Sequence, residues 1–230
     1  MANATVFPSP QRPATAVQGI GDSHDDNVYS AVVLAHGGAT TQTLFLAGIG
    51  APIPQITGTA ITAANLPAHY LTYTPTTTMI QQSGQLGNSV GDFSIRAIGV
   101  TIDTQQTIAG VGRVWGAGAP EVVDICSKCR LEVKLSNKRR VLGPLWSFPT
   151  LGGPAGSTTA NATSLVQNSM FATGRRIASK FEVARNDTLT VDFTADAALA
   201  FSDTSFASTH AGQATLVWVL CIGTANSDVR

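Results

Sequence analysis

The sequence predicts an all-β protein, and three observations carry this prediction. Residues 180–194 (KFEVARNDTLTVDFT) alternate apolar and polar side chains on both sides of the turn-forming Asn186-Asp187-Thr188. A strand with one buried and one exposed face produces this period of two. Residues 216–222 (LVWVLCI) are continuously apolar, which indicates a central strand buried on both faces. Most other segments are short strand-like runs between loops rich in Gly, Pro, Ser and Thr.

The alternating segment 180–194 is interpreted as a hairpin, or as two strands joined at a tight corner, with both apolar rows in one core. The predicted core collects the inward-facing members of the alternating runs and one tryptophan: Phe93, Ile95, Leu131, Val133, Leu135, Phe181, Val183, Leu189, Val191, Phe193 and Trp218. Their polar neighbours are expected to be exposed or to lie at contacts between subunits: Arg130, Glu132, Lys134, Glu182, Thr190 and Asp192. A slip of one residue would exchange the two sets, so their burial tests the register.

Three other segments carry specific predictions. In residues 92–103 the apolar phase switches in mid-strand, which indicates a β-bulge or burial on both faces. Residues 164–174 (SLVQNSMFATG) are the only stretch with helical character. Residues 69–82 are interpreted as strand-like but interrupted by Pro75.

The pattern of elements favours a jelly roll. About nine to eleven strands with at most one helix exclude a βαβ architecture. Long excursions between strands favour a Greek-key jelly roll, a β-sandwich or barrel of eight strands, over an up-and-down barrel with short connections. A single jelly roll with long loops, formed by residues 29–230, is therefore the favoured fold. A compact double jelly roll is the alternative.

Residues 1–28 are expected to form an extended N-terminal arm outside this domain. The segment contains Pro, Gly and an acidic stretch at residues 22–26 but few apolar residues, so that it has no core of its own. A disordered tail is one interpretation. The other is an arm that becomes ordered on a neighbouring subunit through its few apolar side chains: Val6, Phe7, Val17 and Ile20.

The charge content favours association with other protein subunits. Charged residues make up 12% of the 230 residues, against roughly 25% in an average globular protein, and a sparsely charged surface promotes association. Lys plus Arg and Asp plus Glu both number 14, and this zero net charge argues against non-specific binding to a nucleic acid backbone. Lys138-Arg139-Arg140 is interpreted as a solvated loop, with contact to a phosphate or lipid headgroup as the alternative.

The N-terminal sequence and the cysteines favour a soluble protein made in the cytoplasm. Residues 1–13 contain neither the basic nor the apolar region of a signal peptide, and the longest apolar run, residues 216–222, is too short to span a bilayer. The chain has three cysteines, Cys126, Cys129 and Cys221, without a disulfide-like framework. A structural zinc site needs four ligands, and beside the Cys126-x-x-Cys129 pair only Cys221 is left to contribute sulfur, so a chance spacing or core cysteines are favoured over a metal or redox site.

No combination of residues predicts an active site, and we expect no enzyme, no cofactor and no metal ion. The four histidines are isolated and form no H-x-H pair of the kind that metal-binding cupins need: His24, His36, His69 and His210. The chain has no G-x-S-x-G stretch and no glycine-rich loop ending in GK[ST]. Several carboxylates are expected at strand ends or on exposed faces, with a bound Ca²⁺ as the alternative to solvation: Asp92, Asp103, Asp124, Asp187 and Asp192.

Four segments, taken in order, resemble the jelly-roll capsid proteins of tailless icosahedral bacteriophages. They are residues 82–102 (QSGQLGNSVGDFSIRAIGVTI), 129–153 (CRLEVKLSNKRRVLGPLWSFPTLGG), 175–195 (RRIASKFEVARNDTLTVDFTA) and 215–224 (TLVWVLCIGT). The resemblance implies a subunit that stands upright in a shell, contacts neighbours through its sides and often overlies an internal membrane. Many members of the family are double jelly rolls, whereas the shortness of this chain favours a single one.

The resemblance therefore implies a structural virion protein, the major capsid protein or a related one, that self-assembles into an icosahedral shell. Its partners would be copies of itself, other virion proteins and an internal membrane, with no direct sequence-specific binding of nucleic acid. It would be made in the host cytoplasm and located in the virion. The alternative is a virion spike, or a receptor- or carbohydrate-binding jelly-roll module. Such modules stack sugars on exposed aromatic side chains, and the three tryptophans lie mostly in strand-like segments: Trp115, Trp146 and Trp218.

Overall fold

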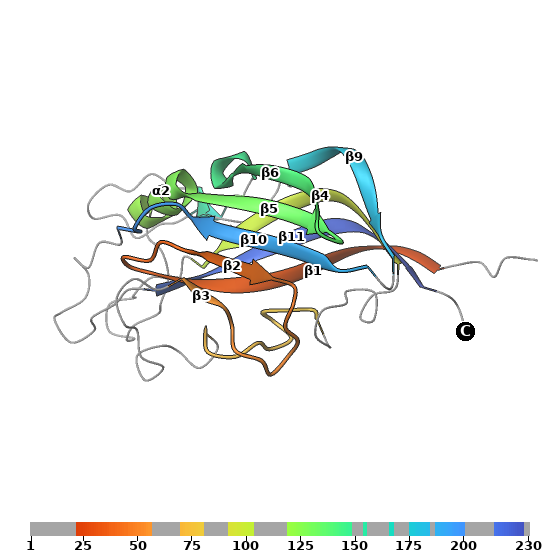
Figure 1. The fold of residues 1–230 in the computed structure, drawn as a ribbon, viewed down its shortest axis with the longest axis horizontal. Helices are drawn as coiled ribbons and strands as arrows, with labels where there is room; N and C mark the ends of the chain where they lie inside the picture. Colours follow the sequence, from red (N-terminus) through yellow and green to blue (C-terminus); the bar gives the residue numbers. More distant parts are fainter. Residues whose placement is uncertain are drawn as a thin grey trace, which may run out of the picture.

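The protein is a sandwich of two β-sheets (Figure 1). The computed structural model describes residues 22–56, 70–80, 92–103, 119–148, 154–155, 166–167, 175–184, 187–200 and 214–227. The larger sheet has five strands in the order β3 (Gln55–Ile56), β1 (Asp22–Ala35), β11 (Ala214–Ser227), β4 (Asp92–Ile102) and β9 (Arg175–Val183). The smaller sheet has four strands in the order β2 (Thr41–Leu44), β10 (Leu189–Ala195), β5 (Cys129–Leu135) and β6 (Lys138–Pro144).

The remaining elements are short. The two-residue strands β7 (Pro154–Ala155) and β8 (Val166–Gln167) pair with each other. The α-helix α2 (Ala119–Lys128) and the 3-10 helix η3 (Leu145–Ser147) pack against each other beside β5 and β6. Among the described residues, no helix is long and apolar enough to cross a membrane.

The core lies between the two sheets and follows the predicted alternation. On β5 and β10, buried and half-buried residues alternate in the predicted register, with Leu189 and Val191 buried. All predicted core residues are buried except Trp218, which is half-buried. Of the predicted polar neighbours, Glu182 is exposed and the other five are half-buried. The prediction for Trp218 is wrong because this residue points away from the core, towards a second apolar cluster on the outer face of the five-stranded sheet.

The segment 180–194 forms two strands joined at a corner, not a hairpin. Its first strand, β9, belongs to the five-stranded sheet, whereas its second strand, β10, belongs to the four-stranded sheet. At the corner, the backbone N–H of Asp187 donates a 2.9 Å hydrogen bond to the carbonyl of Ala184. Both apolar rows nevertheless enter one core, as the second of the two interpretations predicted.

The phase switch in residues 92–103 is a β-bulge. The pairing of β4 with both of its neighbours shifts between Ile95 and Ala97, so that Arg96 has no residue opposite it on β11 or β9. The extra residue returns Ile98 to the core side that Ile95 occupies, as expected of a bulge. On β11 the bulge faces Gly223, where a Cβ atom would overlap the carbonyl oxygen of Ser94.

The outer face of the five-stranded sheet is partly covered by the excursion between β2 and β4. Tyr73, from the described part 70–80, donates a 2.8 Å hydrogen bond from its hydroxyl to the carbonyl of Ala31. The indole N–H of Trp218 donates to the carbonyl of Thr76 at 3.1 Å. The described part of residues 69–82 forms isolated bridges rather than a strand, so the strand-like interpretation is wrong: the segment is held by side chains and single bridges.

Three other expectations need correction. Strand β1 begins at Asp22 and pairs with β11 along its whole length, so the expected boundary at residue 28 falls inside a strand. Val166 and Gln167 are in β8, which contradicts the predicted helix at these two positions. Lys138-Arg139-Arg140 begins the edge strand β6 instead of forming a loop. The remaining residues of the predicted helix, and the arm residues 1–21 with their four apolar side chains, lie outside the described residues.

Candidate functional site

In the described part of the chain, no group of three or more His, Cys, Asp or Glu side chains is placed to hold a metal ion. Asp124 is in α2 instead of at a strand end, and its carboxylate binds Lys128 at 2.7 Å and the backbone N–H of Ala200 at 2.7 Å. The other four carboxylates occupy strand ends, the corner after β9 or the outer face of β10: Asp92, Asp103, Asp187 and Asp192. His24 lies in β1 and His36 follows it, whereas His69 and His210 are outside the described residues.

The cysteines pack in the core or against it. Cys129 and Cys221 are buried, and burial raises the pKa of each thiol to about 12. Cys126, on α2, is half-buried, and burial raises its pKa as well. Because the thiolate is the nucleophile and the metal ligand, this arrangement fits the interpretation of Cys126-x-x-Cys129 as packing residues.

The outer face of the four-stranded sheet carries a ladder of paired charges. Lys134 of β5 binds Asp192 of β10 at 2.5 Å, and the hydroxyl of Thr43 on β2 donates to the same carboxylate at 2.7 Å. Burial alone would raise the pKa of Asp192, but these two hydrogen bonds and the charge of Lys134 outweigh it and hold the pKa below its usual value. On the next strand, Arg139 binds Glu132 at 2.7 Å. Positive and negative groups therefore neutralise each other across this face.

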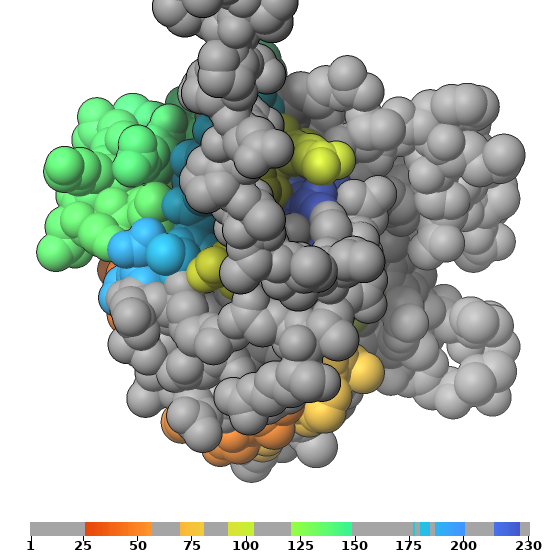
Figure 2. All heavy atoms as spheres, turned by 90° about the vertical axis from the view of Figure 1, so that its right-hand side faces the viewer, coloured from red at the N-terminus to blue at the C-terminus, as the bar shows by residue number. Residues whose placement is uncertain are grey.

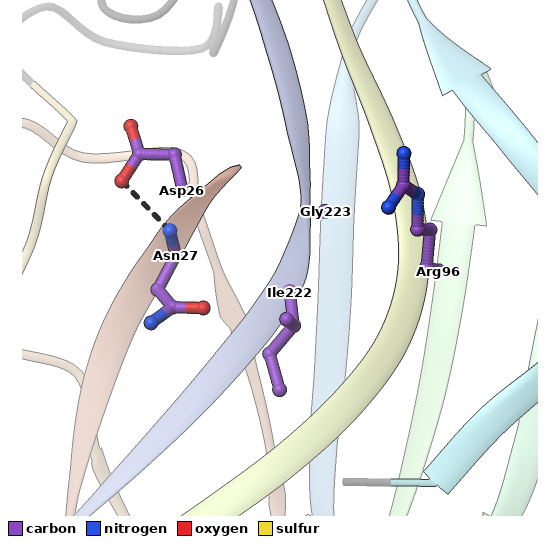
Figure 3. Close-up of a pocket in the computed structure, with 5 residues that line it drawn as sticks. All are labelled: Asp26, Asn27, Arg96, Ile222 and Gly223. Atoms are coloured by element: carbon purple, nitrogen blue, oxygen red, sulfur yellow. Dashed lines mark hydrogen bonds between the residues drawn. The ribbon is translucent and has the colours of Figure 1, made fainter. Parts of the chain in front are cut away.

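A pocket of about 210 Å³ lies over the first strand of the chain and the bulge (Figure 3). It is lined by Asp26 and Asn27 of β1, Ile222 and Gly223 of β11, and Arg96 of β4. Asn27 and Ile222 are offset by one residue from the buried pair Val28 and Cys221, so they face away from the core. One carboxylate and one guanidinium over an apolar floor can hold a polar group, but this lining contains neither a nucleophile nor a general base next to one.

The edge of the four-stranded sheet is the most unusual surface of the described residues. Lys138, Arg139 and Arg140 are exposed, and the guanidinium of Arg140 lies over the ring of Phe181, 6.0 Å from its centroid. Three large apolar side chains are exposed further along this edge and on the helices at its far end: Leu142 of β6 by 41%, Trp146 of η3 by 70% and Val123 of α2 by 67%. We call this surface, made of residues 138–140 with Leu142, Trp146 and Val123, the β6 edge.

Residues of this kind are typical of protein–protein contacts, because aromatic and Arg side chains are enriched there. Sequence reasoning missed Trp146 and Val123. The run RRVLGPLWSFP has no strict alternation, so it does not show which of its apolar side chains point outwards. Only the folded arrangement, in which Leu145 is buried and Trp146 is not, identifies the exposed member.

Comparison of the chain with protein-family models, with curated protein sequences and with solved structures finds no match.

Proposed function

We propose that the protein is a structural virion subunit, a single jelly roll that assembles with copies of itself into an icosahedral shell. The order of its strands is the observation that carries the proposal. Among the residues that the structure describes, eight strands are longer than two residues: in chain order, β1, β2, β4, β5, β6, β9, β10 and β11. The five-stranded sheet places the first beside the eighth, then the third and the sixth, and the four-stranded sheet places the second beside the seventh, then the fourth and the fifth.

This interleaving supports a jelly roll, because two nested Greek keys distribute eight strands between two sheets in this way. It also favours the single jelly roll over the compact double one, which would need about sixteen strands. The neighbouring strands are antiparallel and far apart in the chain: β1 pairs with β11, and β2 pairs with β10. Such a sandwich is a rigid block whose sides are available for contacts with other subunits.

The composition of the surface favours assembly over a monomeric state. Only 12% of the residues are charged, and those on the outer face of the four-stranded sheet pair with one another, as Lys134 does with Asp192. A surface with little net charge promotes association, and the β6 edge offers exposed apolar side chains to a partner. Copies of the same chain are the partners of this proposal. Other virion proteins and an internal membrane would be further partners of the completed shell.

The experiment is a measurement of mass. The full chain, purified without denaturant, is passed over a sizing column with light scattering, over a range of salt and protein concentrations. We expect particles many times heavier than the 23.8 kDa chain, with a mass that rises with concentration. A species of 23.8 kDa under all conditions would contradict the proposal.

A carbohydrate-binding module is the second candidate, and the exposure of Trp146 is the observation that favours it. Its indole, 70% exposed, is free to stack on a sugar ring. A glycan array decides between the two functions. We expect no glycan to bind above background; binding that Trp146→Ala abolishes, in a chain that remains monomeric, would favour the module instead.

A further inference from the structure

The exposed large apolar side chains of the described residues fall into two groups. One group belongs to the β6 edge, and the other consists of Leu46 and Ile49, 41% and 44% exposed, in the segment after β2. Single exposed apolar side chains are common on folded proteins. Exposed apolar side chains that gather in two places are stronger evidence of a binding surface than single ones, because larger apolar patches mark sites of contact.

The two groups lie on opposite sides of the sandwich. β6 is the outermost strand of its sheet on the side where β9 ends the other sheet, as the contact between Arg140 and Phe181 shows. β2 is outermost on the other side, next to β1. Figure 1 shows β6 along the top of the molecule and the segment after β2 along the bottom. Figure 2, seen from the right-hand end, shows the green atoms of residues 121–148 at the upper left and orange atoms at the bottom.

The same two sides carry charged stretches of opposite sign. The β6 edge has three basic residues in succession, at positions 138–140, and β1 begins with three aspartates among residues 22–26. On the β1 side, the described residues contact the outer edge of this strand from Tyr29 onwards, through Met79, Thr78 and β3. Within the described part of the chain, the first residues of β1 therefore form an edge as well.

Both charged stretches lie at the same end of the sandwich. Strand pairing places His24 of β1 level with Val183, through Ala225 and Phe93. The corner after Val183 touches the turn between β5 and β6, because the backbone N–H of Ser136 donates a 2.9 Å hydrogen bond to the carbonyl of Thr188. The apolar residues of each side lie further from this end. Leu142 and η3 follow residues 138–140 along the chain. On the other side, the backbone N–H of Ile49 donates to the carbonyl of Ile80, and the adjacent Met79 donates to the carbonyl of Tyr29, further along β1 than residues 22–26. Charge and apolar surface thus occur in the same order on the two sides.

We propose that one copy of the chain binds the next by placing its β6 edge against the opposite side of that copy. Residues 138–140 then face the acidic residues 22–26, and Trp146 contacts Leu46 and Ile49. This inference rests on the proposed function, since it names the two surfaces through which subunits of the shell meet. Because the two surfaces differ, the contact is heterologous, so that it repeats head to tail and closes into a ring or continues through a shell.

Basic residues on an edge strand have a second explanation. Charged side chains on sheet edges discourage pairing with other chains, and the β6 edge would then be a surface that keeps copies apart. Under that explanation, a reversed charge at Lys138 would not be rescued by a reversed charge on β1. Trp146 would have no part in association either.

The test compares self-association of the full chain by sedimentation velocity in the wild type and four variants: Lys138→Glu, Asp26→Lys, the double variant with both changes, and Trp146→Ala. Lys138 is exposed, so its reversal leaves the core intact. Thr190→Glu is the matched control, because it adds a charge opposite Lys134 on the outer face of the four-stranded sheet, away from both sides. The melting temperature of each variant reports whether the fold is kept.

We expect each single charge reversal to weaken association about tenfold, because like charges then face each other, and the double variant to recover to within about threefold of the wild type. Trp146→Ala is expected to weaken association about tenfold, and Thr190→Glu to leave it unchanged.

The contact is refuted if the double variant associates no better than the single ones, or if Trp146→Ala associates like the wild type. If Asp26→Lys lowers the melting temperature, its association cannot be compared with that of the wild type. The results for Trp146→Ala and Lys138→Glu then decide whether the contact exists. If the wild-type chain stays monomeric, both the proposed function and this contact are wrong. If the wild type assembles and the variants assemble equally well, only the contact is wrong.

Discussion

Lys134 and Asp192 form a 2.5 Å ion pair across β5 and β10, on the outer face of the four-stranded sheet. Each residue lies one position away from a buried neighbour, Val133 and Val191 respectively, which face each other in the core. The pair therefore shows how period two separates a polar ladder from an apolar core on the same two strands.

The first prediction concerns acid stability. The pKa of Asp192 is lower in the folded protein than its usual value, so this carboxylate contributes stability that is complete above about pH 4 and is lost as the pH falls through its folded pKa. Asp192→Asn should lower the free energy of unfolding at pH 7 by about 1 kcal/mol. Urea unfolding at pH 7 and at pH 3 measures this: the difference between variant and wild type should shrink at the lower pH. A difference that grows on acidification would contradict the assignment.

The second prediction tests the register of β10. Val191→Asp should cost about 3 kcal/mol or more, because Val191 is completely buried and an unpaired carboxylate would be left in the core. Thr190→Asp is the matched change one position away, on the half-buried outer face opposite Lys134, and it should cost about 1 kcal/mol or less. Thermal unfolding of both variants gives the comparison, and equal losses would mean that the register is different.

The third prediction concerns the bulge. Gly223→Ala should destabilise the protein by about 1–3 kcal/mol, because the added methyl group meets the backbone of Ser94 and the ring of Phe93 and cannot be avoided by a side-chain rotation. Chemical unfolding measures the loss. A variant as stable as the wild type would show that β11 and β4 are further apart at this point.

The fourth prediction concerns the thiols. In the native protein at pH 8, a thiol reagent should modify Cys126 first, because it is half-buried, whereas Cys129 and Cys221 are buried with pKa values near 12. In denaturant all three should react. Cys126→Ser should remove the early phase, and an early phase that persists in this variant would place one of the other two cysteines at the surface.

Where an apolar residue alternates with a polar one, as in β5 and β10, the sequence was sufficient to predict which side chains are buried. The sequence around Trp218 was not sufficient, because a continuously apolar strand does not show which of its side chains face the core. Only the excursion that covers the outer face of the sheet shows which way the indole points. The bulge at Arg96 was predictable as one of two alternatives, since an extra residue is what shifts the phase between Ile95 and Ile98.

The elements that sequence reasoning missed depend on partners distant in the chain. Helix α2 has ten residues, too few for a clear period of 3.6, and Pro120 resembles a turn signal although proline is favoured in the first turn of a helix. The start of β1 is polar and acidic, and it is a strand because β11 supplies its hydrogen bonds from Asp22 onwards. The β6 edge was likewise hidden, because the exposure of Trp146 depends on how η3 packs against α2.

Electron microscopy of the purified full chain tests the central claim, assembly into a shell, most directly. The sample is imaged after concentration at neutral pH and moderate salt, and the particles are sorted by size and symmetry. We expect closed particles, or regular rings and sheets of subunits, in which each subunit contacts its neighbours through its sides. Fields that contain only single, unassociated subunits of 23.8 kDa at every concentration would contradict it.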